Sequence, residues 1–161
     1  MKKLGILHVS DVHIDAKSIS EVDCMVKKLI KDIECVTTEN NIKIDLICFA
    51  GDLIFRGDQA VDGEGQIHIA EEHFINPLLH CLGLSNHEFI IVPGNHEIDK
   101  KHVDDIIESG LASMPTKQAI DDTIYHMSDF YKSRLQYFYD YIYEKYVCDA
   151  EKWNLGYSIQ R

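Results

Sequence analysis

The amino-acid sequence predicts an α/β fold in which three parallel strands alternate with two helices. Three short runs of mostly branched apolar residues, at 4–9, 44–50 and 89–92, predict the strands. Between these runs, apolar residues recur every three or four positions, as they do on one face of an amphipathic helix. The order strand–helix–strand–helix–strand is typical of a parallel sheet. Because the runs show little alternation, we expect strands that are covered on both faces.

Both helical stretches carry local start or stop signals. Ser18 and Glu21 have the spacing of a capping box and predict the start of the first helix. Its expected apolar face consists of Val22, Met25, Val26, Leu29, Ile30, Ile33 and Val36. Pro77 predicts a kink or break in the second helix, and Gly83 predicts its end. The expected apolar face of that helix consists of Ile67, Ala70, Phe74, Ile75, Leu78, Leu79 and Leu82.

After residue 97 the pattern becomes mainly helical. A short helix is predicted around Ile106 and Ile107, and a longer, tyrosine-rich helix from about Ser128 to Cys148. Residues 155–161 are expected to begin a further strand. We therefore divide the chain into a βαβαβ core over 1–97, a helical insert over 98–154 and the start of another strand over 155–161.

Composition excludes several classes of protein. In 161 residues, 45% are hydrophobic and 27% charged, which is the balance of a globular domain rather than of a disordered chain. The formal charge of −11 disfavours a surface that coats nucleic acid. No stretch approaches the ~20 apolar residues of a membrane-spanning helix. The five cysteines form no C-x-x-C pair, so we expect reduced, mostly buried thiols and a cytoplasmic protein.

Polar residues suited to metal binding follow each predicted strand. They are Asp11 and His13 after the first strand, Asp52 after the second, and Asn95 and His96 after the third. Ligands of an open parallel sheet bind beyond the carboxyl ends of its strands, so these side chains are expected at one edge. Alternate residues of an extended segment point the same way, so Asp11 and His13 are expected to hold one ion together. Mixed oxygen and imidazole donors suit Mn, Fe, Zn or Ni.

These motifs, D-x-H, G-D and G-N-H-E in that order, resemble the signature of the calcineurin-like metallophosphoesterases. The resemblance implies a four-layer α-β-β-α sandwich, of which the βαβαβ core would be the N-terminal portion. It also implies hydrolysis of phosphodiester or phosphomonoester bonds with two divalent metal ions as cofactors, manganese being the first choice.

The resemblance assigns a role to each matching residue. Asp11 and His13 would bind the first metal, and Asp52 would bridge the two metals. Asn95 would bind the second metal and the substrate phosphate, which His96 would also contact. As the catalytic residue, His96 would protonate the leaving oxygen, and such a general acid must be protonated near neutral pH. Glu97 stands where many members have Asp, an exchange that we expect to matter little.

The family pattern is incomplete in this sequence. Members carry later histidines in a G-H step and a G-H-x-H motif, and neither motif occurs here. We therefore expect the chain to be an N-terminal portion of a longer protein. A C-terminal half or a partner chain would then complete the metal site.

The sequence is compatible with three functional interpretations. The Gly51–Leu53 and Val92–Glu97 segments favour the small-molecule or cyclic-nucleotide phosphodiesterase branch. The Leu7–His13 segment also resembles the opening of SbcD-type DNA nucleases, although the acidic charge disfavours nucleic acid as a partner. From another class, the chain would be a catalytically incomplete regulatory or interaction module that uses the tyrosine-rich helix as its contact surface.

Overall fold

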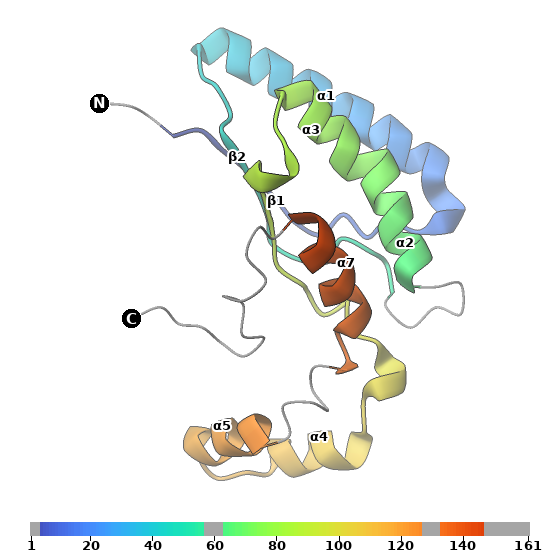
Figure 1. The fold of residues 1–161 in the computed structure, drawn as a ribbon, viewed down its shortest axis with the longest axis vertical. Coiled ribbons are helices and arrows are strands. Elements are labelled where there is room, and N and C mark those ends of the chain that lie inside the picture. The colour runs from blue at the N-terminus through green and yellow to red at the C-terminus, as the bar shows by residue number, and fades with distance from the viewer. Residues whose placement is uncertain (1–3, 57–62, 127–132, 147–161) are drawn as a thin grey trace.

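The computed structural model describes residues 4–56, 63–126 and 133–146 of the chain (Figure 1). Its three strands are β1 (Ile6–Val9), β2 (Leu46–Phe49) and β3 (Phe89–Ile91). The helices are α1 (Ile19–Asn40), α2 (Gly63–Ala70), α3 (Asn76–Leu82), α4 (Asp105–Ala112), α5 (Lys117–His126) and α7 (Gln136–Tyr146). Single helical turns at Ala16–Ser18, Asn86–Glu88 and Lys100–His102 are of the 3₁₀ type.

The strands form one parallel sheet with β2 in the middle. Ile6 of β1 is aligned with Leu46 of β2, and Ile47 of β2 with Phe89 of β3. The predicted βαβαβ order and parallel pairing are thus confirmed, with each strand somewhat shorter than its apolar run. Since all three strands point the same way, their carboxyl ends lie along one edge of the sheet.

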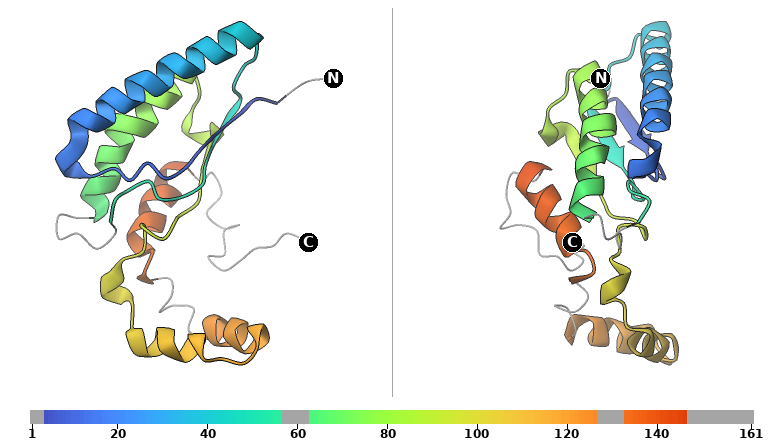
Figure 2. Two further views of the ribbon diagram at one scale, coloured as in Figure 1. Left: turned by 180° about the vertical axis from the view of Figure 1, so that it is seen from behind. Right: turned by 90° about the vertical axis from the view of Figure 1, so that its right-hand side faces the viewer.

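Helices cover one face of this sheet, on which α1 and α3 lie side by side (Figures 1 and 2). The core between sheet and helices consists mainly of Ile47, Phe49, Phe89, Ile91, Val22, Val26, Ile33, Phe74, Ile75 and Leu78. On the opposite face, Ile6 is 51% exposed and Ile90 is 46% exposed. The expectation that both faces are covered is therefore wrong for the described residues, because both connecting helices pack on the same side.

The connections differ from the predicted ones in detail. Ser18 precedes α1 but its side chain makes no capping bond to the helix; instead its hydroxyl donates to the Asp15 carbonyl at 3.1 Å. The predicted capping box is therefore wrong, because Asp15 already caps the short 3₁₀ turn that leads into α1. The second connection, between β2 and β3, runs from α2 through a π-helical turn (Glu71–Ile75) into α3, where Pro77 occupies the first turn. Gly83 ends α3 in the left-handed conformation, as predicted.

The four described cysteines are all free thiols. They are Cys24, Cys35, Cys48 and Cys81. The expectation of burial is wrong for Cys24 and Cys35, which are exposed because they lie on the outer side of α1.

Beyond the sheet, the predicted short helix is present as α4, whereas α5 was not anticipated. These two helices lie away from the sheet and its covering helices (Figure 1). The tyrosine-rich helix α7 begins at Gln136 and packs against α2, burying Phe138 and Tyr141. The residues predicted to begin this helix, at 128–132, and the strand expected at 155–161 lie outside the described ranges. Within the described ranges, no helix combines the length and apolar character needed to cross a bilayer.

A substitution at Phe74 tests how much the contact between the second connection and the sheet contributes to stability. Its side chain is fully buried, and its ring packs edge-on against Phe49 with 5.8 Å between centroids. We expect Phe74→Ala to lower the free energy of unfolding by about 3–5 kcal/mol in urea titrations, because it leaves a cavity. The control Ile106→Ala removes a side chain that is 83% exposed, and it should change stability by less than ~0.5 kcal/mol. Equal losses in the two variants would contradict the assigned core.

A charged contact joins α7 to the second connection. Burial raises the pKa of Glu71, but hydrogen bonds from Lys145 and Tyr141, with the charges of Lys145 and His68, outweigh it and hold this pKa below its usual value. A carboxyl group with a lowered folded-state pKa stabilises the fold above its unfolded-state value, and this stabilisation is lost as the pH falls through the folded-state value. The wild-type protein should therefore be more stable than Glu71→Gln at pH 7, and the difference should shrink below about pH 4.5. Urea titrations across pH 3–7 measure it, and a difference that grows on acidification would contradict the assignment.

Candidate metal centre

The loops that follow β1 and β2 run side by side beyond the ends of the strands. The Asp11 N–H donates to the Gly51 carbonyl at 3.1 Å. Two residues on, the His13 N–H donates to the Asp52 carbonyl at 3.0 Å. The pairing continues to a parallel bridge between the fully buried residues Ile14 and Ile54. Backbone hydrogen bonds therefore hold His13 and Asp52 next to each other, at the edge where the sheet ends.

Three of the four non-glycine residues with positive φ in the described part of the chain lie at this edge. Asp11, His13 and Asp52 have φ of 58°, 51° and 57°, in the left-handed region. Asn41 at the end of α1 is the one other non-glycine residue with positive φ in the described ranges. Each such residue costs of order 1–3 kcal/mol, and such strain collects at functional sites where packing over-determines the conformation. The observed strain supports a functional role for these two loops.

The loop after β3 approaches the Asp52 loop at backbone contact. A Cβ atom added to Gly51, whose φ is +99°, would lie 2.8 Å from the Gly94 Cα. A Cβ atom added to Gly94 would lie 2.1 Å from the Asp52 Oδ1. Only glycine allows this approach from both sides. The two glycines therefore let the ends of β2 and β3 bring Asp52 and His96 together.

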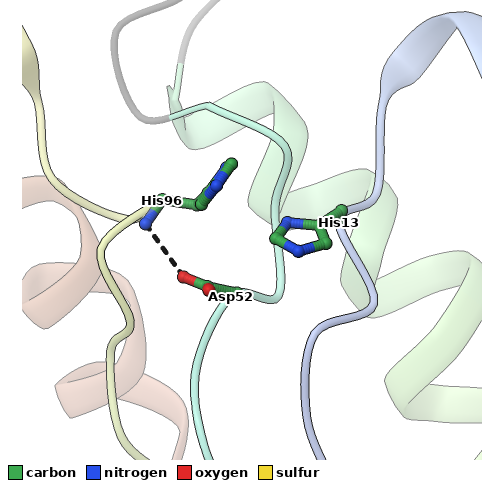
Figure 3. Close-up of side chains that lie close together, drawn as sticks. All are labelled: His13, Asp52 and His96. Carbon is green, nitrogen blue, oxygen red and sulfur yellow. Dashed lines mark hydrogen bonds between the residues drawn. The ribbon is translucent and has the colours of Figure 1, made fainter.

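Three of the predicted residues form one cluster, which we call the His13–Asp52–His96 group (Figure 3). One potential ligand atom from each side chain lies within 4.8 Å of the others. The imidazole rings of His13 and His96 meet edge-on, with 4.3 Å between centroids. The backbone N–H of His96 donates to Asp52 Oδ1 at 2.9 Å and orients the carboxylate. The group thus joins side chains from the loops after all three strands.

The donor atoms of this group fit a divalent metal ion. His13 Nδ1 is buried and has no hydrogen-bond partner among the described residues. A buried polar atom without a partner is costly, and an ion there would satisfy it. His96 Nδ1 lies 2.5 Å from the Phe55 carbonyl oxygen, which can only accept, so this nitrogen carries the proton and Nε2 is left for another partner. Two imidazoles and a carboxylate suit Mn, Fe, Zn or Ni.

The other two predicted ligands, Asp11 and Asn95, are exposed. Asp11 is exposed and is not part of the His13–Asp52–His96 group. The expectation that Asp11 and His13 lie on one extended segment is wrong, because both have left-handed backbone, which removes the alternation of a strand. Asn95 is exposed and precedes His96 in the loop after β3.

One residue of the site was missed by the sequence-based assignment of roles. Glu97 is fully buried beneath the group, and its carboxylate accepts backbone N–H bonds from the loops that follow β2 and β3. A signal for it exists in the sequence, because Glu97 follows Gly94 by three positions. This is the spacing at which a capping-box glutamate reaches back to a backbone N–H.

Comparison with known proteins agrees with this geometry. A family model described as calcineurin-like phosphoesterase matches residues 4–156. The metallophosphoesterase-like protein YydB of Bacillus subtilis (strain 168) is 25% identical over 122 residues. That match covers 76% of this chain and 23% of the length of YydB. No solved structure matches the chain significantly. Since the family model spans nearly all of the sequence, and the G-D and G-N-H-E motifs meet in one cluster, the chain belongs to the calcineurin-like phosphoesterase family.

Proposed function

We propose that this chain provides the metal centre of a phosphoesterase that hydrolyses phosphodiester or phosphomonoester bonds. The observation that carries the proposal is the His13–Asp52–His96 group, in which the buried Nδ1 of His13 has no partner among the described residues. Family membership supports a metal-dependent phosphoesterase, and the group supplies donors of the right chemistry at the expected edge of the sheet.

Each residue of the group has a distinct proposed part. His13 and Asp52 would hold divalent metal, and Asp11 and Asn95 are proposed as further ligands from the same loops. Bound metal would neutralise phosphoryl oxygens and lower the pKa of water. His96 would contact the substrate phosphate and donate a proton to the leaving oxygen through Nε2, because Nδ1 is held by the Phe55 carbonyl.

With His96 as the proton donor, the group offers two ligand atoms, those of His13 and Asp52, which are fewer than two divalent ions require. We propose that a partner chain or a further C-terminal segment of the protein supplies the remaining ligands. Manganese is the first proposed metal, with Fe, Zn or Ni as the alternatives, because the site combines oxygen and imidazole donors without thiolate.

A small phosphodiester or a cyclic nucleotide is the proposed substrate, in preference to DNA. The formal charge of −11 supports this preference, because binding to nucleic acid is driven largely by Lys and Arg contacts to phosphates. A DNA nuclease is the alternative, which a comparison of substrates tests.

The first test is Mn²⁺-dependent hydrolysis of bis-p-nitrophenyl phosphate by the full chain. Asp52→Asn and His96→Ala should each lower kcat/KM by about 100-fold or more, because they remove a metal ligand and a proton donor. A chelator should abolish turnover, and Mn²⁺ should restore it. The matched control is Asp45→Asn, at the opposite end of the β2 segment, where the carboxylate accepts the Gly5 N–H at 3.0 Å and lies 3.9 Å from the Lys43 Nζ.

Several outcomes of that assay would contradict the proposal. Turnover that survives both site variants, or that falls equally in Asp45→Asn, would mean that the group does not carry the reaction. Comparison with p-nitrophenyl phosphate, a cyclic nucleotide and duplex DNA tests the substrate class. Hydrolysis of DNA in preference to the small diesters would favour the nuclease alternative.

Metal binding is tested separately from turnover. We expect His13→Ala to raise the Kd for Mn²⁺ by at least about tenfold in isothermal titration calorimetry, because it removes a proposed ligand. His80→Ala, which removes an exposed histidine of α3, should leave the Kd unchanged. An unchanged Kd in His13→Ala would exclude this imidazole as a ligand.

A further inference from the structure

Glu97 is a fully buried carboxylate placed between the loops that follow β2 and β3. Its Oε2 accepts the N–H of Asp52 at 2.9 Å and the N–H of Gly94 at 2.6 Å. Its Oε1 accepts the N–H of Leu53 at 2.7 Å and the N–H of Ile54 at 3.1 Å. A single side chain therefore satisfies four main-chain donors from two loops that are more than forty positions apart in the sequence.

These bonds require a group that only accepts. An ionised carboxyl group has about four acceptor positions and no donor, so four N–H groups match it fully. In glutamine of the same shape, an NH₂ group would replace one oxygen and face two N–H donors. Among the described residues no cation pairs with Glu97, so the main-chain bonds are its identified partners there.

The location of the four bonds connects Glu97 to the metal centre. Asp52 has left-handed backbone, and its loop meets Gly94 at backbone contact. The Asp52 N–H and the Gly94 N–H both donate to Oε2, so one oxygen holds the two loops at this contact. The same contact lets the His96 N–H reach Asp52 Oδ1 at 2.9 Å.

The main chain of Glu97 is also anchored to α7. The Tyr137 hydroxyl donates to the Glu97 carbonyl at 2.6 Å. Two residues further, the Asp99 N–H donates to the carbonyl of Arg134 at 2.8 Å. Because the backbone at 97 is held from this side, its side chain is positioned to bond both loops.

We propose that Glu97 is a positioning residue whose carboxylate holds Asp52 in metal-binding geometry, with His96 beside it, before any ion is present. The inference rests on the proposed function for the role of the metal, but the bonds themselves belong to the metal-free chain. Glu97 does not touch metal or substrate, and it acts through the backbone of Asp52 and Gly94. Groups that orient metal ligands change metal affinity or activity by about 10–100-fold when they are removed.

The experiment compares three variants of the full chain by isothermal titration with Mn²⁺ and by steady-state kinetics. Glu97→Gln keeps the shape but adds a donor, and we expect it to raise the Kd for Mn²⁺ at least about tenfold and to lower kcat. Glu97→Asp keeps an acceptor-only carboxylate that is one methylene shorter, and it should retain more affinity than Glu97→Gln. Glu71→Gln is the matched control, because it neutralises another largely buried glutamate, one that pairs with Lys145 of α7, and its Kd should equal that of wild type.

A role in packing alone predicts the reverse order. If only shape mattered, Glu97→Gln would bind Mn²⁺ like wild type and Glu97→Asp would be the worse variant. That order would overturn the inference, as would a loss of affinity in Glu71→Gln as large as that in Glu97→Gln.

A second measurement tests the positioning role of Glu97 even if Glu97→Gln does not fold. In metal-free wild-type protein, the amide protons of Asp52, Leu53, Ile54 and Gly94 should exchange slowly with solvent by NMR. Exchange at the rate of open loop amides would overturn the inference even if Mn²⁺ binds normally. Conversely, slow exchange in a wild-type chain that binds no Mn²⁺ would contradict the proposed function while supporting the positioning of the two loops by Glu97.

Discussion

The contact between the backbone of the loop after β2 and that of the loop after β3 is the constraint on which the site depends. Gly51 and Gly94 make it sterically feasible, because a Cβ atom at either position would collide with the opposite loop. Glu97 satisfies four main-chain N–H groups that the contact removes from water. Asp52 and His96 are held together as a consequence.

The sheet positions the loops that make this contact. Parallel pairing places the carboxyl ends of β1, β2 and β3 at one edge, and the first two loops continue the pairing as far as Ile14 and Ile54. Ile14, Leu53 and Ile54 are fully buried next to His13 and Asp52. Packing of these residues fixes the backbone directly after His13 and Asp52, which helps their left-handed conformations to persist.

The candidate metal centre and the uncovered face of the sheet both fit the N-terminal part of the family fold. Helices α1 and α3 cover one face, while Ile6 and Ile90 are exposed on the other. In the family that the chain resembles and belongs to, a second sheet completes a four-layer sandwich. The described residues contain the first sheet with its helices, together with the loops that carry the His13–Asp52–His96 group. The arrangement of the described residues is therefore that of the N-terminal α/β core of the family.

The sequence alone determined the strand–helix order and the end of the helix at Gly83. It also determined that Asp52, His13 and His96 follow the three strands. Such features depend on local periodicity and turn chemistry, which neighbouring residues decide. Only the tertiary structure showed that both connecting helices pack on one face, that Asp11 and His13 have left-handed backbone, and that Glu97 bonds two loops. These features depend on how segments distant in the sequence meet, and a contact between distant backbones leaves no periodic signal in the residues that make it.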